Sequence, residues 1–99
     1  MNALDLIAAE RARQISQEGW TPEHDDKYVT GQLASAAESY VGYVAMVQMG
    51  QDDGEEGPPF TWPWDDEWWK PTTPLRNLVK AGALIVAEIE RLQRKDPNP

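Results

Sequence analysis

Residues 73–95 read TPLRNLVKAGALIVAEIERLQRK, and this stretch decides the fold. Thr73 is a suitable helix N-cap, and Pro74 suits the first helical position because its missing N–H would have no partner there. Apolar residues then recur with a four-three alternation, close to the heptad spacing of helices that pack against each other. The stretch therefore predicts a helix over 73–95 with an apolar seam of Leu75, Leu78, Val79, Gly82, Val86, Ile89 and Leu92, widened by Leu84 and Ile85.

Two further helices are predicted, over residues 3–18 and 30–47. Asn2 is a plausible N-cap for the first, and Gly19 is suited to end it. The first helix has an apolar stripe of Leu4, Ile7, Ala8, Ala12 and Ile15, and the second has one of Leu33, Ala34, Ala37, Tyr40, Val41, Val44 and Val47. No stretch alternates as a strand would. We therefore expect a single all-α domain over residues 1–99, a three-helix bundle.

Two connecting segments have unusual compositions. Residues 49–60 are rich in Gly, Asp, Glu and Pro and predict a solvated acidic loop. Residues 60–71 hold four of the five tryptophans, and the prolines there disfavour a long regular element. Because each indole buries on the order of 200 Å², we expect this aromatic segment to pack on the helices or to line a recess.

The composition excludes several classes of protein. The net charge of −8 argues against general nucleic-acid binding through phosphate contacts. Seven of the acidic residues, and no basic ones, fall within 51–67, so a locally basic pocket remains compatible with the acidic total. The absence of cysteine, of a signal-peptide pattern and of a membrane-spanning apolar run leads us to expect a cytoplasmic protein.

Cations and aromatic residues meet near the start of the last predicted helix. Arg76 and Lys80 are one turn apart, and free N–H groups at that helix end also favour an anion. With Lys70 they make a candidate phosphate or carboxylate site, beside which Trp68 and Trp69 could stack on a flat ring. In the alternative interpretation, the acidic residues 65–67 neutralise these cations and the tryptophans only fill the core.

The connector Glu23-His24-Asp25-Asp26 is dense in possible metal ligands. A metal site there would need further oxygens, for example from Glu10 or Glu38, whereas the simpler interpretation is a hydrogen-bonded turn. His24 could also donate to a ligand phosphate. We expect no metal, and we expect a ligand site formed by Arg13, Trp20, His24, Trp68, Trp69, Lys70, Arg76 and Lys80.

The segments 10–16, 18–26, 62–64, 68–71 and 78–85 together resemble a group of small phage and prophage proteins, most of them uncharacterised. This resemblance implies a phage-encoded protein that acts inside a bacterial cell. The chain is more loosely similar to MazG-like all-α nucleotide pyrophosphohydrolases, which are magnesium-dependent. It departs from their glutamate pattern, since Gln32 and Asn77 are amides where that pattern needs acids.

Three functions follow as hypotheses. The first is a non-catalytic protein that binds an anionic nucleotide-like ligand, sequestering a host signal or interfering with host defence, and needs no cofactor. The second is a MazG-like hydrolase that uses Mg²⁺ on Glu10, Asp26, Glu38 and Glu88. The third is an acidic inhibitor of a host protein, which would act through residues 51–67. Under all three we expect a homo-oligomer, because the seam of the last helix is longer than one neighbouring helix requires.

Overall fold

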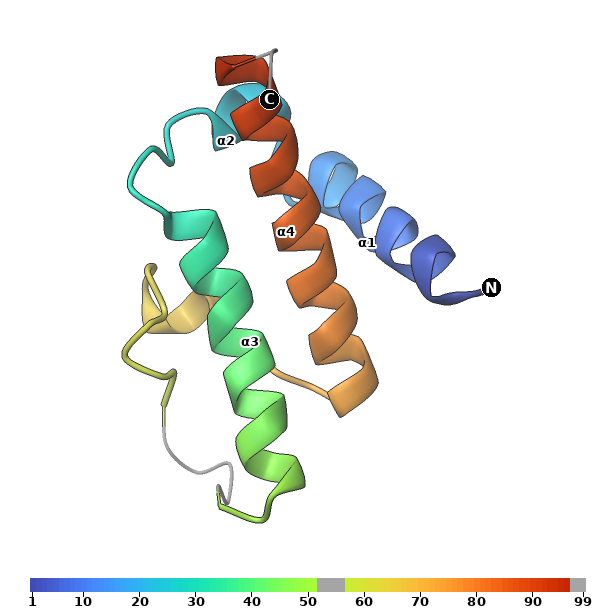
Figure 1. The fold of residues 1–99 in the computed structure, drawn as a ribbon, viewed down its shortest axis with the longest axis vertical. Coiled ribbons are helices and arrows are strands. Elements are labelled where there is room, and N and C mark those ends of the chain that lie inside the picture. The colour runs from blue at the N-terminus through green and yellow to red at the C-terminus, as the bar shows by residue number, and fades with distance from the viewer. Residues whose placement is uncertain (52–56, 97–99) are drawn as a thin grey trace.

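The computed structural model describes residues 1–51 and 57–96, and it is all-α (Figure 1). Four α-helices and one short 3₁₀ turn follow one another along the chain, and no strand occurs among the described residues. The all-α prediction is therefore confirmed. Part of the acidic loop predicted at 49–60 lies outside the described residues. The elements are α1 (Ala3–Gln17), α2 (Pro22–Asp25), α3 (Gln32–Gln48), η1 (Asp66–Trp68) and α4 (Pro74–Lys95).

Local capping chemistry fixes the helix ends. Asn2 and Asp5 form a reciprocal capping box at the start of α1. The hydroxyl groups of Thr21 and Thr73 accept the N–H groups of the third residues of α2 and α4, each of which begins with a proline. The helix predicted from residue 30 begins instead at Gln32, because Gly31 has a left-handed backbone with φ of 85° that cannot belong to a right-handed helix.

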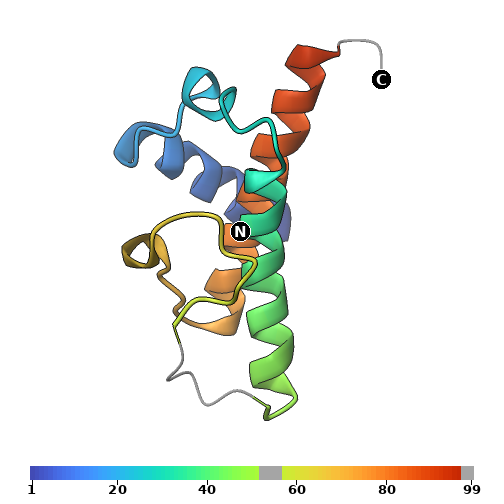
Figure 2. The ribbon, with the colours of Figure 1, turned by 90° about the vertical axis from the view of Figure 1, so that its left-hand side faces the viewer.

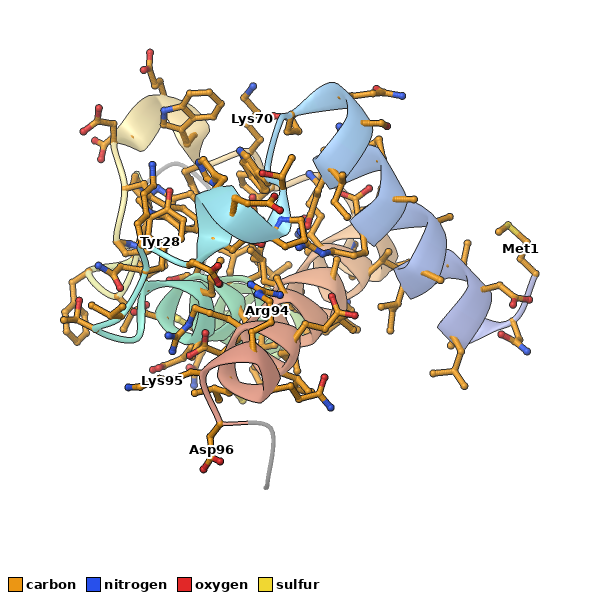
Figure 3. All side chains as sticks on the ribbon, turned by 90° about the horizontal axis from the view of Figure 1, so that it is seen from above. Met1, Tyr28, Lys70, Arg94, Lys95 and Asp96 are labelled. Atoms are coloured by element: carbon orange, nitrogen blue, oxygen red, sulfur yellow. The ribbon has the colours of Figure 1, made fainter. Side chains whose placement is uncertain are left out.

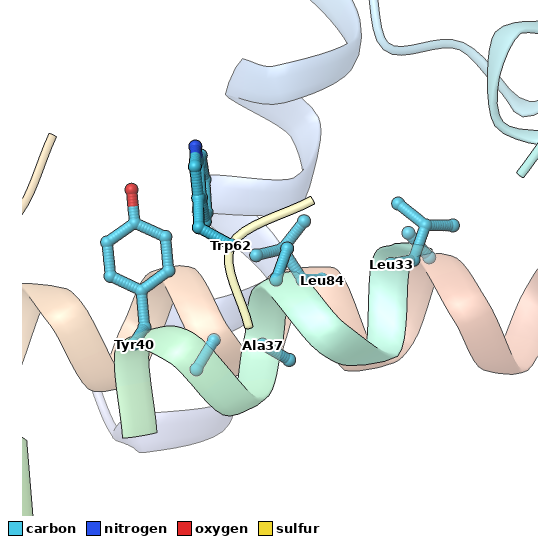
Figure 4. Packing of buried hydrophobic residues seen from close by; sticks show 8 residues of the cluster. Leu33, Ala37, Tyr40, Trp62 and Leu84 are labelled. Carbon is cyan, nitrogen blue, oxygen red and sulfur yellow. The ribbon is translucent and has the colours of Figure 1, made fainter. Parts of the chain in front are cut away.

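α4 is the central helix of the fold, because it contacts α1, α2 and α3. In Figure 2, α3 and α4 stand side by side, while α2, the aromatic segment 60–71 and the C-terminal part of α1 lie on one side of that pair and the N-terminal part of α1 passes behind it. The main core lies where α3, α4 and the aromatic segment meet (Figure 4). Its buried members are Leu33, Ala36, Ala37, Tyr40, Trp62, Ala81, Leu84 and Ala87.

The aromatic segment closes this core with two of its rings. Trp62 is 9% exposed and meets Tyr40 edge-on at 5.6 Å between ring centroids. Trp69 stacks on the ring of Tyr40, with ring centroids 4.6 Å apart and ring planes 30° apart. The indole N–H of Trp62 donates to the carbonyl of Asp65 over 3.1 Å, so burial of this ring leaves no unsatisfied donor.

Most of the predicted seam of α4 is not its buried face, and this is a correction; of the predicted residues, Val79 and Leu84 are buried. Leu75, Leu78, Ile85, Ile89 and Leu92 are each between 45% and 58% exposed. The face toward α3 consists mainly of small residues, which let the two backbones approach closely enough to exclude water. The buried residues of α4 are Asn77, Val79, Ala81, Ala83, Leu84, Ala87 and Arg91.

The apolar stripe predicted on α1 is also not its buried face. Leu4, Ala8 and Ala12 are exposed, and Ile7 and Ile15 are only partly covered. The residues of α1 that are buried are Glu10, Arg11 and Gln14. The reason is electrostatic, since these polar groups pair with partners on α2 and α4, and the helix turns its charged face inward to meet them.

Candidate ligand-binding site

A buried carboxylate organises a group of cations where α1 meets α4. Glu10 is 2% exposed and accepts two hydrogen bonds from Arg13, each of 2.9 Å. Arg76 of α4 donates a third, of 2.7 Å. Burial alone would raise the pKa of Glu10, but the hydrogen bonds and charges of Arg13 and Arg76 outweigh it and hold the pKa below its usual 4.5. Glu10 is therefore ionised at neutral pH and fixes both guanidinium groups.

Two lysines add positive charge that this carboxylate does not neutralise. The ammonium group of Lys80 donates to the carbonyl of Lys70 over 2.6 Å and lies 5.7 Å from the centre of the Tyr40 ring. Burial lowers the pKa of Lys80; attraction to Glu10 opposes this, and repulsion from Arg76, Arg13 and Lys70 adds to it. A bound anion would relieve that repulsion.

The acidic residues 65–67 do not neutralise these cations. Among the described residues, the ion pairs of Arg13 and Arg76 are made with Glu10 and Glu18, and neither Lys70 nor Lys80 has a carboxylate within 4.0 Å. Arg13, Arg76, Lys70 and Lys80 together face only two acids, Glu10 and Glu18. The neutralising alternative considered from the sequence is therefore wrong for residues 65–67, although Glu10 takes part of that role.

A small cavity opens beside the cations. Its volume of about 60 Å³ has room for a few water molecules or for one oxyanion. The side-chain oxygen of Gln14 is buried at its wall without a hydrogen-bond partner, although Gln14 is only 2% exposed. An unsatisfied buried acceptor of this kind indicates a missing donor, such as water or a ligand group. We call this the cationic cavity; Arg13, Trp20, Trp68, Lys70 and Lys80 are among its lining residues.

A larger cavity of about 340 Å³ adjoins it and is walled by rings. Trp64 stands between Trp20, at 6.1 Å, and Tyr28, at 5.3 Å between centroids. The N–H of Trp64 is buried without an acceptor, which makes it a second unsatisfied group in the same region. Trp20, Trp64 and Trp68 line both cavities, so the two share a wall. We call this the aromatic cavity; it is lined by Trp20, His24, Asp25, Tyr28, Leu33, Pro63, Trp64, Asp65 and Trp68.

A buried ion pair holds α2 as one side of the aromatic cavity. Arg11 donates to Asp25 over 2.7 Å and to the carbonyl of Trp20 over 3.1 Å. The ring nitrogen Nδ1 of His24 lies 3.3 Å from the other oxygen of Asp25. This pair ties α1 to α2 and orients His24, so the connector forms a hydrogen-bonded turn. Figure 3 shows Lys70 near the C-terminal end of α1, on the same side of α3 and α4.

Six of the eight residues expected at the ligand site line one of the two cavities. Arg76 touches the site only through Glu10, and Trp69 packs with Tyr40 and the edge of Tyr43 in the core. Sequence reasoning missed Gln14, Tyr28 and Trp64 as members. The spacing of Glu10, Arg13 and Gln14 on one helix face was the available signal for part of it.

The ligands considered for a hydrolase do not converge. Glu10 binds two arginines, Asp26 pairs with Arg94 at 2.7 Å, and Glu88 pairs with Arg91 at 2.6 Å. Within 1–51 and 57–96, no three His, Cys, Asp or Glu side chains are grouped so as to hold a metal ion.

Two further observations complete the description. In the part of the chain that the structure describes, no helix combines the length and apolarity needed to cross a membrane. Comparisons with protein-family models, with curated proteins and with solved structures find no match for this chain.

Proposed function

We propose that this protein binds an anionic nucleotide-like ligand without transforming it. The flat ring of the ligand occupies the aromatic cavity, and its phosphate or carboxylate faces Arg13, Lys70 and Lys80 in the cationic cavity. The observation that carries this proposal is the shared wall of Trp20, Trp64 and Trp68, which joins an aromatic recess to an excess of positive charge.

The sizes and energies support such a ligand. A volume of about 340 Å³ lies at the lower end of the range for small-molecule pockets. Stacking of one base on an aromatic side chain contributes about 1–3 kcal/mol, and hydrogen bonds to charged groups about 1.5–3 kcal/mol each. One stacked ring and three charged hydrogen bonds together contribute about 5.5–12 kcal/mol before the cost of association is subtracted.

The distribution of acids favours binding over hydrolysis. Glu10, Asp26 and Glu88 are each engaged by arginine, so they are poor candidates for magnesium ligands. A non-catalytic role also agrees with the proposed origin, a phage-encoded protein that sequesters a nucleotide signal in the cytoplasm of its host. We further infer that it acts as a homo-oligomer.

Isothermal titration calorimetry with linear and cyclic nucleotides tests the proposal. We expect saturable binding of at least one of them and recovery of the intact ligand after denaturation. Trp68→Ala and Lys80→Gln should each weaken binding at least tenfold, because they remove a ring wall and a cation. Phe60→Ala and Lys95→Gln are the matched controls, since Phe60 is 99% exposed and neither residue is among those that line the two cavities. Absence of heat with the whole panel, or release of pyrophosphate, would contradict the proposal.

A further inference from the structure

The exposed face of α4 carries an uninterrupted apolar row. We propose that two copies of this chain form an antiparallel dimer through the α4 seam, defined as Leu75, Leu78, Gly82, Ile85, Ile89 and Leu92. This inference specifies the self-association proposed above and does not depend on the ligand. Successive seam residues are three and four positions apart, which is the spacing by which helices pack along a common line. The five large members are between 45% and 58% exposed.

The described elements of the same chain leave the large seam residues about half exposed. Ala81, Leu84 and Ala87 belong to the core between α3 and α4. α1 meets the seam only at its edge, where the side chain of Ile7 lies against Gly82. Figure 2 shows α2, the aromatic segment and the C-terminal part of α1 on one side of the α3–α4 pair, whereas Figure 1 shows α1 beside α4 on the side away from α3.

The size of this surface suits a second copy better than water. Five Leu and Ile side chains that are about half exposed leave on the order of 400–500 Å² of apolar surface, as much as the largest patch on a typical monomer. An apolar groove of about 390 Å³ between α1 and α4, lined by Ala3, Leu6, Ile7, Leu75, Leu78 and Val79, extends it. Two such surfaces would bury about 800–1,000 Å² in total, the size of a small, transient interface.

The seam is complementary to itself when the helices run in opposite directions. Leu75 then faces Leu92 of the partner subunit, and Leu78 faces Ile89 of the partner subunit. The large seam residues therefore match along the antiparallel pair, whereas the space beside Gly82 is already occupied by Ile7 of the same chain.

Electrostatics favours the antiparallel direction. Opposite ends of the two helix dipoles then lie together. A parallel pair would instead place the basic end of α4, with Arg94 and Lys95, beside its own copy. Positions beside the seam include Val79 and Val86, so little charge is buried on association.

Light scattering after size exclusion tests the dimer with the 99-residue chain. We expect twice the chain mass of 11.2 kDa at micromolar concentration. Ile85→Glu should raise the dissociation constant at least about 30-fold, because it buries an unpaired carboxylate. The control is Val29→Glu, which adds the same charge at a position 63% exposed between α2 and α3. Circular dichroism should show that both variants remain helical. A wild-type monomer, or equal dissociation of both variants, would overturn the proposal.

Cysteine cross-linking tests the register, and the absence of natural cysteine makes the experiment clean. A mixture of Leu78→Cys and Ile89→Cys chains should form mixed disulfides under mild oxidation, because these positions face each other and a disulfide needs Cα atoms within about 7 Å. Leu78→Cys alone should cross-link at least tenfold less, since two copies of residue 78 would lie about 16 Å apart along the antiparallel pair. Efficient cross-linking of Leu78→Cys with itself would overturn the antiparallel arrangement, whatever the outcome of nucleotide binding.

Discussion

Replacement of Glu10 by glutamine tests whether one buried carboxylate holds α1 against α4. The substitution keeps the shape but removes the charge that accepts three hydrogen bonds of 2.7–2.9 Å from Arg13 and Arg76. Each bond to a charged group contributes about 1.5–3 kcal/mol, and breaking a buried ion pair costs about 3–5 kcal/mol. Both arginine side chains are more than a third exposed and can rehydrate. We therefore expect a loss near the lower end, about 3 kcal/mol.

For a chain of this size, 1 kcal/mol corresponds to a shift of roughly 4–5 °C in the unfolding midpoint, so Glu10→Gln should lower it by about 12–15 °C at pH 7. The difference should disappear in acid. The pKa of Glu10 in the folded state lies below 4.5, so its stabilising effect is complete above that pH and is lost as the pH falls through the folded-state pKa. Protonated glutamate then resembles glutamine.

Thermal unfolding followed by circular dichroism at pH 7 and at pH 3–4 measures both effects. Glu90→Gln is the control, because Glu90 is exposed on the same helix that carries Arg76. The reasoning is refuted if Glu10→Gln unfolds within 3 °C of the wild type at pH 7. A gap that stays the same at acid pH would also refute it, since the charge would then not be its cause.

Three further predictions follow from the same contacts. Binding of an adenine nucleotide should weaken as the pH rises through the lowered folded-state pKa of Lys80, so the decline should begin below 10.5; calorimetry at pH 7–10 should find no such decline in Lys80→Met. Asp25→Ala should cost about 3–5 kcal/mol in urea unfolding because it strands buried Arg11, and adding Arg11→Met should recover part of that loss; strictly additive losses would argue against a coupled pair. Gly42→Ala should stabilise the fold by about 0.5–1 kcal/mol, because the added methyl group meets nothing within 4 Å. Gly82→Ala should gain nothing, since its Cβ would lie 2.7 Å from Ile7; equal gains at both glycines would show that α1 does not pack as described.

Much of the local structure could be predicted because it depends on neighbours in the chain. Asn2, Thr21 and Thr73 cap their helices with their own side chains, and proline follows two of them. These interactions reach only three residues along the chain, so the sequence contains all the information they need. The seven-residue spacing on α4 likewise predicted a helix with an apolar row.

The candidate site could be predicted only in part. The composition of residues 60–71 indicated that the rings would pack or line a recess, but not which rings would do which. Trp69 packs on Tyr40 in the core, Trp62 is buried there and also lines the cationic cavity, and Trp64 and Trp68 line both cavities. Neighbouring tryptophans in an irregular segment can point in either direction, and the contacts that decide this come from α3 and α2.

The sequence by itself therefore determined where α1 and α4 begin, that the helices have an apolar side, and that cations and indoles occur together. Only the tertiary structure decided which side each helix buries. α4 packs on α3 through Ala81, Leu84 and Ala87 because small residues allow the closest approach, and this leaves its other Leu and Ile side chains about half exposed. α1 turns Glu10 and Arg11 inward because their partners, Arg76 and Asp25, are fixed by other elements. Pairings between distant residues depend on the whole fold, so no local pattern contains them.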